Sequence, residues 1–450
     1  MTWPDTAHRD EAGRLVIGGV ALTDLAARFG TPLYVFDEAT LRARASRFRT
    51  AFASAYADSR VVYAGKAYLS PTIVAILWEE GLGLDIVSGG ELYAGLAAGV
   101  PAAAMTFHGN NKDEVELAEA IAAGVGRIAV DNLGELDLLA RMTRDIATNV
   151  PILLRLNPGV DVHTHPKMLT GAIDSKFGLP VISGEAAVAV ARAQESPGLD
   201  LVGYHAHVGS QVFDAELVRR TLATMLEFAA AMRDRHGVVP RAIDPGGGFG
   251  VAYEDGQNDV SVETWAETAG AAVREGCARF ALPLPELTVE PGRAIVGPAG
   301  VALYRIGFRK EVPGVRTYVS VDGGMADNIR PSLYGARYTA ALANRDGSGA
   351  TETVTIAGKY CELGDVLIEN ATLPRLITGD LLAVPVAGAY CLPMASNYNL
   401  ARRPAVVMVR EGQAVLIRRR ETYSDLLATE VVPSRDGLPP AGRESSPLAP

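Results

Sequence analysis

The sequence predicts an α/β fold, a (β/α)8, TIM-like barrel followed by a second, mainly β domain. Strand-like apolar segments alternate with helical patterns up to about residue 290, these segments number eight, and strands with few helices between them follow after about residue 295. The expected barrel strands are 61–64, 83–87, 105–108, 127–130, 152–156, 201–207, 241–244 and 286–290. Eight βα repeats close into a barrel whose active site lies at the carboxyl ends of the strands.

Four parts are expected along the chain. Residues 1–36 contribute short strands that lie outside the barrel count and join the β domain, and residues 37–290 form the barrel. Residues 291–430 form the C-terminal β domain, because strand-like segments recur there. Residues 431–450 are rich in Pro, Gly and Ser and contain few large apolar side chains, which predicts a disordered tail.

The composition favours a small-molecule partner. The 450-residue chain has a formal net charge of −10, whereas nucleic acids and anionic membranes need clustered Lys and Arg. Its three cysteines are too few for a disulfide framework or a four-cysteine zinc site. The longest apolar run, about 381–395, contains two prolines and is shorter than the roughly 18 residues that a membrane span needs. We therefore expect a soluble, cytoplasmic protein with no nucleic-acid or membrane partner.

Lys66 follows the first expected barrel strand. The run from Val61 to Tyr68 is apolar, β-branched and aromatic apart from this one cation. A partly desolvated lysine loses its proton readily and can attack an aldehyde carbon. On this stretch alone, a surface lysine at a strand end is the simpler interpretation.

Residues capable of chemistry recur at the ends of the expected strands. They are Lys66, Asp85, His108, Asp131, Arg155, His205, His207, Asp244, Glu290 and Arg293. Polar residues at one strand end would be unremarkable, but a full set in register indicates the rim of one site. A doubly wound open sheet is the competing architecture, and it would place its glycine-rich turn after the first strand. Here that turn, Gly246 to Gly250, follows the seventh.

Two turns in this rim are suited to binding a phosphate. The turn from Gly246 to Gly250 offers backbone N–H groups without Cβ obstruction, although a plain tight turn is equally consistent with it. The turn from Glu290 to Arg293 adds a carboxylate and further amides after the eighth strand, and barrels commonly bind phosphate after strands seven and eight. A lysine, a carboxylate and a phosphate cradle in one rim suggest pyridoxal 5'-phosphate (PLP).

Two His-x-His pairs, His163 with His165 and His205 with His207, favour a different function. Residues i and i+2 of a strand share a face, so such a pair can chelate zinc in a barrel hydrolase. The first pair follows Asn157-Pro158-Gly159 and is therefore expected in a loop, which weakens the case for a metal. We predict no metal site.

An ordered set of motifs resembles the fold-type III PLP-dependent decarboxylases, the family of alanine racemase-like and ornithine decarboxylase-like enzymes. The motifs are 63–67, 84–92, 108–112, 175–178, 207–211, 246–250, 290–293 and 361–362. The stretches 321–336 and 387–390 are especially similar to the branch that acts on meso-diaminopimelate. The resemblance runs in unbroken order from about residue 15 to residue 430.

The resemblance implies how the cofactor is bound. Lys66 would hold PLP covalently, His207 would stack on its ring, and Glu290 would pair with the pyridine nitrogen. The phosphate would lie against Ser210, Gly248, Pro291, Gly292 and Arg293.

The resemblance also implies the substrate and the assembly. The enzyme would decarboxylate meso-2,6-diaminopimelate at its D-centre to give L-lysine and CO2, the last step of lysine biosynthesis. The distal, L-configured end would be held by Arg293, Arg330, Tyr334 and Glu362, with Tyr390 close to cofactor and substrate. The family works as a homodimer with shared sites, so Cys361 and Glu362 would reach in from the partner subunit, Cys361 as general acid.

Some positions depart from the family pattern. Leu363 stands where Ser is common, residues 391–394 differ from the usual Gly-Phe-Ser-Met, and Tyr68 replaces a frequent Asn. Three alternatives stay open. A sister decarboxylase of ornithine, arginine or a carboxylated polyamine would use the same cofactor residues. A non-catalytic regulator would be expected to lose Lys66 or Cys361, and the third alternative is a metal-dependent barrel hydrolase.

Overall fold

The computed structural model describes residues 2–145, 149–159, 175–254 and 256–431. It contains the expected closed parallel barrel. The barrel strands are β5 (Ser59–Ala64), β6 (Gly83–Ile86), β7 (Met105–Phe107), β8 (Arg127–Val130), β9 (Val150–Asn157), β11 (Leu199–Ala206), β12 (Ala242–Asp244) and β13 (Glu286–Val289). Each pairs in parallel with the next, and β13 pairs with β5 to close the sheet. The short β10 (Leu179–Pro180) extends it beside β9. The fold class predicted from the eight segments is confirmed.

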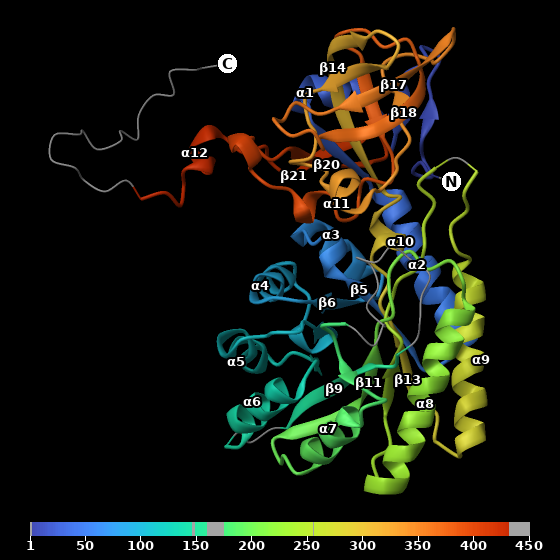
Figure 1. Ribbon diagram of the computed structural model, residues 1–450, viewed down its shortest axis with the longest axis vertical. Coiled ribbons are helices and arrows are strands. Elements are labelled where there is room, and N and C mark those ends of the chain that lie inside the picture. The colour runs from blue at the N-terminus through green and yellow to red at the C-terminus, as the bar shows by residue number, and fades with distance from the viewer. Residues whose placement is uncertain (1, 146–148, 160–174, 255, 432–450) are drawn as a thin grey trace, which may run out of the picture.

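Helices cover the outside of the barrel (Figure 1). They are α2 (Glu38–Ala55), α3 (Pro71–Glu79), α4 (Gly89–Ala97), α5 (Glu114–Ala123), α6 (Leu133–Thr143), α7 (Glu185–Gln194), α8 (Glu216–His236) and α9 (Val262–Phe280). Side-chain caps fix where several of them begin. Asp113 accepts a hydrogen bond from the Glu116 amide at the start of α5, and Asn132 does the same for α6. These two caps anchor the loops after β7 and β8, which carry the strand-end residues His108 and Asp131.

The second part of the molecule is a mainly β domain at one end of the barrel (Figure 1). Its strands are β14 (Gly300–Val312), β15 (Arg316–Val321), β16 (Ala341–Leu342), β17 (Thr351–Ala357), β18 (Val366–Pro374), β19 (Leu381–Val384), β20 (Ala405–Arg410) and β21 (Gln413–Arg418). The strand β4 (Leu33–Asp37), which precedes the barrel, lies between β14 and β20. The short helices α10 (Arg293–Val296), α11 (Arg330–Tyr334) and α12 (Tyr423–Leu426) also belong to this half of the chain.

The first residues form a small sheet of their own. The strands β1 (His8–Arg9), β2 (Leu15–Ile17) and β3 (Val20–Ala21) pair only with one another among the described strands. Their apolar side chains, together with α1 (Leu22–Phe29), pack on β4, β14 and β20 in one hydrophobic cluster. The N-terminal segment thus contacts the β domain mainly through side chains, and only β4 enters its main sheet.

One hydrophobic core continues from the barrel into the β domain. It includes Tyr63 and Ile86 of the barrel, Phe36 of β4, and Val319 and Ile356 of the β domain. This shared core fixes the β domain over the carboxyl ends of the barrel strands, where it can contribute to a site. No helix in the described residues is long and apolar enough to span a membrane. Apart from Val431, the expected disordered tail lies outside the described residues.

Candidate active site

A cavity of about 450 Å³ opens at the carboxyl ends of the barrel strands. It is lined by Lys66, Val87, His108, Gly109, Asn110, Arg155, Phe177, His205, His207, Ser210, Glu290, Arg293, Arg330, Tyr334 and Tyr390. Eight of these are site residues predicted from the sequence: Lys66, His207, Ser210, Glu290, Arg293, Arg330, Tyr334 and Tyr390. A larger hollow of about 800 Å³ lies alongside, between the α11–β16 segment and β18, and none of the strand-end residues lines it.

Lys66 lies in a short turn directly after β5. Its side chain remains 39% exposed, and Nζ lies 3.9 Å from Oδ2 of the buried Asp85. Burial lowers the pKa of Lys66, but the Asp85 carboxylate, with the Tyr390 phenol oxygen and the Glu290 carboxylate, outweighs burial, and the pKa is raised above its usual value. Burial also raises the pKa of Asp85, which weakens this pairing without removing it. The expectation that Lys66 readily loses its proton is therefore wrong for the protein alone, because neighbouring negative charge stabilises the ammonium.

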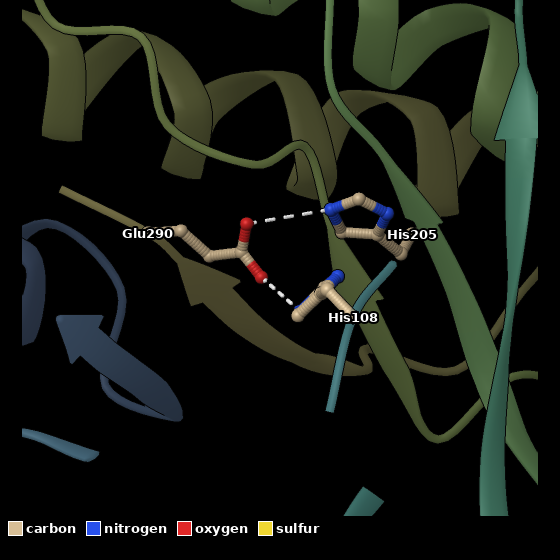
Figure 2. A group of neighbouring side chains, drawn as sticks. All are labelled: His108, His205 and Glu290. Carbon is tan, nitrogen blue, oxygen red and sulfur yellow. Dashed lines mark ion pairs between the residues drawn. The ribbon is translucent and has the colours of Figure 1, made fainter. Parts of the chain in front are cut away.

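Glu290 lies at the floor of the cavity, and its carboxylate faces two neighbouring histidines (Figure 2). His108 Nε2 is 2.7 Å from Glu290 Oε1, and His205 Nε2 is 3.4 Å from Oε2. Burial raises the pKa of Glu290, but the two imidazoles reverse that shift and hold it well below its usual range. Burial lowers the pKa of His205 to about 3, so that ring is neutral near pH 7. Glu290 is thus a buried carboxylate.

The same three side chains are the group in the described residues that could hold a metal ion, with ligand atoms within 4.8 Å of one another. The grouping differs from the His-x-His pairs of the sequence. His205 turns toward Glu290, whereas His207 accepts a hydrogen bond at Nδ1 from the Gly247 amide. His163 and His165 lie outside the described residues.

The floor of the cavity also fits a protonated ring nitrogen. Despite its short contact, Glu290 Oε1 is buried and makes no hydrogen bond of good geometry within the described residues. A buried acceptor without a well-aligned donor is costly unless a ligand supplies one. A pyridinium N–H is a donor of this kind.

A glycine cradle, formed by Gly248, Gly292 and the turns around them, lies beside the cavity. Gly248 has φ +101°, and a Cβ there would come within 2.3 Å of the Gly209 carbonyl oxygen. A Cβ on Gly292 would come within 2.9 Å of the Ala64 Cβ. The Val212 amide donates to the Gly248 carbonyl at 2.9 Å, so the loops after β11 and β12 lie together. Only glycine fits at these two positions, and Ser210 and Arg293, which line the cavity beside them, can donate hydrogen bonds to a phosphate, so the residues present fit PLP.

The turn after β13 completes that cradle. The Pro291 carbonyl accepts a hydrogen bond from the Ala64 amide at 3.1 Å, which ties the turn to the strand that precedes Lys66. Arg293 Nη2 donates to Ser210 Oγ at 3.1 Å. Arg293 lies 4.6 Å from the ring centroid of Tyr390, whose own amide donates to the Ala67 carbonyl at 2.7 Å. The phosphate side and the Lys66 turn are therefore joined by direct contacts.

Arg330 and Tyr334 enter the cavity from α11 of the β domain. Arg330 is 4% exposed, and its Nη1 donates to the hydroxyls of Tyr253, at 2.9 Å, and Tyr338. Burial lowers the pKa of Arg330, but the neighbouring tyrosines and Cys391 more than offset it, and the net shift is upward. This arginine is a permanent buried cation facing the cavity, suited to a carboxylate ligand.

Cys361 and Glu362 do not reach this cavity within one chain. Both are exposed, in the loop between β17 and β18. The Cys361 amide donates to Asn399 Oδ1 at 3.4 Å, and Glu362 Oε1 accepts from the Tyr398 hydroxyl at 2.6 Å. Cys361 borders a separate hollow of about 740 Å³. The expectation that these residues act in the site of a partner subunit stays a prediction.

Several residues of the site were not singled out as ligands from the sequence. His108, Arg155 and His205 were named as strand-end groups, with His205 also in a His-x-His pair and His108 in a family motif, and the strand-end signal placed all three correctly in the cavity lining. Tyr253 and Tyr338, which hold Arg330, carried no signal at all. Both tyrosines lie in loops. Tyr253 is 77 residues from Arg330 along the chain, and Tyr338 is 8 residues from it.

Comparison with known proteins agrees with this geometry. Residues 38–297 match the family model described as pyridoxal-dependent decarboxylase, pyridoxal binding domain. The diaminopimelate decarboxylase of Bacillus subtilis (strain 168) is 45% identical over 433 residues, which cover 96% of this chain and 98% of that protein. The enzyme of the same name from Synechocystis is 44% identical over 441 residues, which cover 96% of this chain and 93% of that protein. The crystal structure of diaminopimelate decarboxylase from M. jannaschii in co-complex with L-lysine superposes with a TM-score of 0.90 at 34% identity, covering 96% of this chain and 99% of that one.

Proposed function

The chain belongs to the family of pyridoxal-dependent decarboxylases, and on that premise we propose that it decarboxylates meso-2,6-diaminopimelate at its D-centre to give L-lysine and carbon dioxide. The observation that carries the proposal is one cavity in which a lysine, a buried carboxylate and a buried arginine from the β domain lie together. The lysine and carboxylate suit the cofactor, and the arginine suits an amino-acid end of the substrate. The likeness to proteins named diaminopimelate decarboxylase over nearly the full length supports this substrate.

The residues that would hold PLP are those of the cavity floor and the glycine cradle. Lys66 would bind the aldehyde carbon, and Glu290 would accept a hydrogen bond from the pyridine nitrogen. The phosphate would be held by Ser210, Gly248, Pro291, Gly292 and Arg293. When bound, PLP supplies an electron sink for the bond that breaks as carbon dioxide leaves.

The charges of the floor support that role. The low pKa of Glu290 keeps it ionised, and an ionised carboxylate keeps a proton on the ring nitrogen that faces it. Burial holds the pKa of His207 well below its usual value, so its ring is neutral. A neutral imidazole can lie flat against the cofactor ring without adding a positive charge to it.

The substrate's distal end would be held by the β domain. Arg330 and Arg293 would bind the distal carboxylate, and Tyr334 and Tyr390 would close the remaining sides of the cavity. Burial strengthens these charge-assisted hydrogen bonds relative to water. Holding the distal end fixes which of the two stereocentres lies at the cofactor, which is the basis of selectivity for the D-centre.

We further propose a cytoplasmic homodimer in which Cys361 and Glu362 complete the partner's site. The carbon that loses carbon dioxide must gain a proton, and the Cys361 thiol would donate it while Glu362 contacts the distal amine. The exposure of both residues on their own chain supports this arrangement. All three cysteines are free thiols, as is usual in a reducing compartment.

A substrate panel on purified, PLP-loaded protein tests the function. Carbon dioxide release and the amine product are measured with meso-diaminopimelate, L,L-diaminopimelate, L-lysine, L-ornithine and L-arginine, each offered alone. We expect L-lysine to form from the meso isomer and no turnover of the L,L isomer, which lacks a D-centre. Turnover of ornithine or arginine in place of the meso isomer would contradict the proposal and indicate a sister decarboxylase.

A further inference from the structure

Tyr253 joins two arginines of the site without lining the cavity itself. Its hydroxyl oxygen accepts hydrogen bonds from Arg293 Nη1 at 2.8 Å and from Arg330 Nη1 at 2.9 Å. All three side chains are buried, with 7%, 7% and 4% exposure for Tyr253, Arg293 and Arg330. Arg293 comes from α10, directly after the last barrel strand, and Arg330 comes from α11 of the β domain. One phenol oxygen therefore links the two halves of the site.

The Tyr253 oxygen reduces the electrostatic repulsion between the two arginines. Two guanidinium groups this close repel each other, and burial removes the water that would screen them. The Tyr253 oxygen places partial negative charge between them. Its ring also faces both cations, with the centroid 4.8 Å from Arg330 and 6.0 Å from Arg293.

Tyr253 is itself held rigidly. Its ring packs edge-on against Tyr338, with centroids 5.2 Å apart and planes at 90°. Tyr338 contacts Arg330 as well, so the tyrosine pair brackets that guanidinium. A rigid acceptor between two cations fixes their separation more closely than the flexible arginine side chains could alone.

We propose that the Tyr253 hydroxyl is a positioning group that sets the spacing of Arg293 and Arg330, and thereby the affinity of the site for the distal amino-acid end of the substrate. The inference deepens the proposed function and rests on it, because it is that function which assigns the distal carboxylate to these arginines. Tyr253 makes no contact with the reacting carbon in this account, so its removal affects binding more than the chemical step.

The test compares Tyr253→Phe with Tyr56→Phe in PLP-loaded enzyme. Tyr56 is a matched control, since it is 5% exposed and its hydroxyl donates to the Pro285 carbonyl at 2.7 Å, away from both arginines. Loss of a hydrogen bond to a charged group predicts about a tenfold rise in KM for meso-diaminopimelate, with kcat within about threefold of wild type. Tyr56→Phe is expected to leave KM unchanged. A wild-type KM in folded Tyr253→Phe would overturn the proposal.

A binding measurement separates this inference from the proposed function. L-lysine keeps the L-configured end that Arg330 would hold, so its affinity for PLP-loaded protein is expected to fall about tenfold in Tyr253→Phe. Equal affinity in wild type and variant would overturn the inference alone. A wild type that neither binds L-lysine nor turns over the meso isomer would overturn the proposed function, and this inference with it.

A double-mutant cycle distinguishes positioning from a general structural role. In an Arg330→Gln background the hydroxyl has one guanidinium fewer to position, so Tyr253→Phe is expected to change KM by no more than about threefold there. A full tenfold effect in that background would show that Tyr253 acts independently of Arg330, and would overturn the proposal. Melting temperatures of all variants, read beside KM, establish that each is folded.

Discussion

At the scale of single residues, two lysines in the same rim have opposite surroundings. Lys112 Nζ donates to the Gly109 and Ala129 carbonyls at 2.7 and 2.8 Å and pairs with Glu135 at 2.7 Å, so its bonding capacity is used within the chain. Within the described residues, the one ion pair of Lys66 is its 3.9 Å contact with Asp85, and its side chain opens into the cavity. A lysine with spare donors beside a cavity is the one available for covalent chemistry.

Replacing Lys66 by Ala therefore removes the attachment point for the cofactor. We expect turnover to fall at least about a thousandfold, because no other described lysine lines the cavity. Borohydride reduction followed by peptide mass analysis is expected to find PLP on the Lys66 peptide in wild type and nowhere in the variant. Lys310→Ala, at an exposed position of β14, serves as the control and is expected to behave as wild type. Cofactor trapped on the Lys66→Ala chain would contradict the assignment.

Glu91, at the start of α4, gives the protein a pH-dependent stability. Burial raises its pKa from 4.5 to about 7, although the Val87 amide donates to its carboxylate. Between these pH values the folded protein keeps a proton that the unfolded chain has lost, so the free energy of unfolding falls as pH rises and the loss is complete above about pH 7. Glu91→Gln keeps an acceptor for Val87 and does not titrate. In urea unfolding, we expect the free energy of unfolding of Glu91→Gln, taken relative to wild type, to rise by about 3 kcal/mol between pH 4 and pH 8. If the free energies of unfolding of Glu91→Gln and wild type differ by the same amount at pH 4 and pH 8, the prediction is wrong.

At the scale of elements, the barrel strands were predictable because each carries its own local signal. An apolar run, a helical pattern and a polar strand end recur eight times, and register then follows from parallel pairing of neighbours along the chain. For example, His205 of β11 pairs in register with Asp244 of β12, and the sequence predicted both at the same end of the barrel. The strand boundaries differ from the expected ones by at most two residues, and those of β8 coincide with them.

The pairing of β11 with β12 depends on one glycine. A Cβ on Gly203 would lie 1.8 Å from the Ala242 carbonyl oxygen, so Gly203→Ala forces the two strands apart. We expect it to destabilise the protein by about 2 kcal/mol or more and to lower activity, because His205 lies two residues along the same strand. Gly90→Ala is the matched control. Its Cβ would come no nearer than 3.7 Å to any atom, so a change between zero and about 1 kcal/mol of stabilisation is expected. Equal urea midpoints for the two variants would contradict the prediction.

At the scale of the whole molecule, the sequence alone could not show how the β domain meets the barrel. Arg330 of α11 and Tyr390, in the loop after β19, reach the cavity from the β domain, and their positions depend on packing between distant segments. The Phe36 ring stacks on Tyr68 at 5.2 Å, and β4 lies between strands that follow it by more than 260 residues. Such contacts leave no local pattern, so these residues could be anticipated only through the family resemblance. Tyr253 is not part of that resemblance and escaped prediction entirely.

The position of Cys361 gives a test of the complete molecule. On one chain it is exposed and outside the cavity that holds Lys66, so a site with both needs two chains. Lys66→Ala and Cys361→Ala, each nearly inactive alone, are expected to regain about a quarter of wild-type activity when co-expressed or exchanged. Half of the dimers are then mixed, and one of the two sites in each mixed dimer is intact.

The matched pairing combines Lys66→Ala with Glu290→Gln. Both residues line the cavity of one chain, so every site in a mixed dimer carries one of the two lesions and no activity is expected to return. Steady-state rates on meso-diaminopimelate, with dimer exchange verified by differently tagged subunits, measure both combinations. Recovery in the first pairing alone would place Cys361 in the partner's site. If the first pairing stays inactive despite verified exchange, the thiol serves its own chain, and the shared-site proposal fails while the assignments of Lys66 and Glu290 stand.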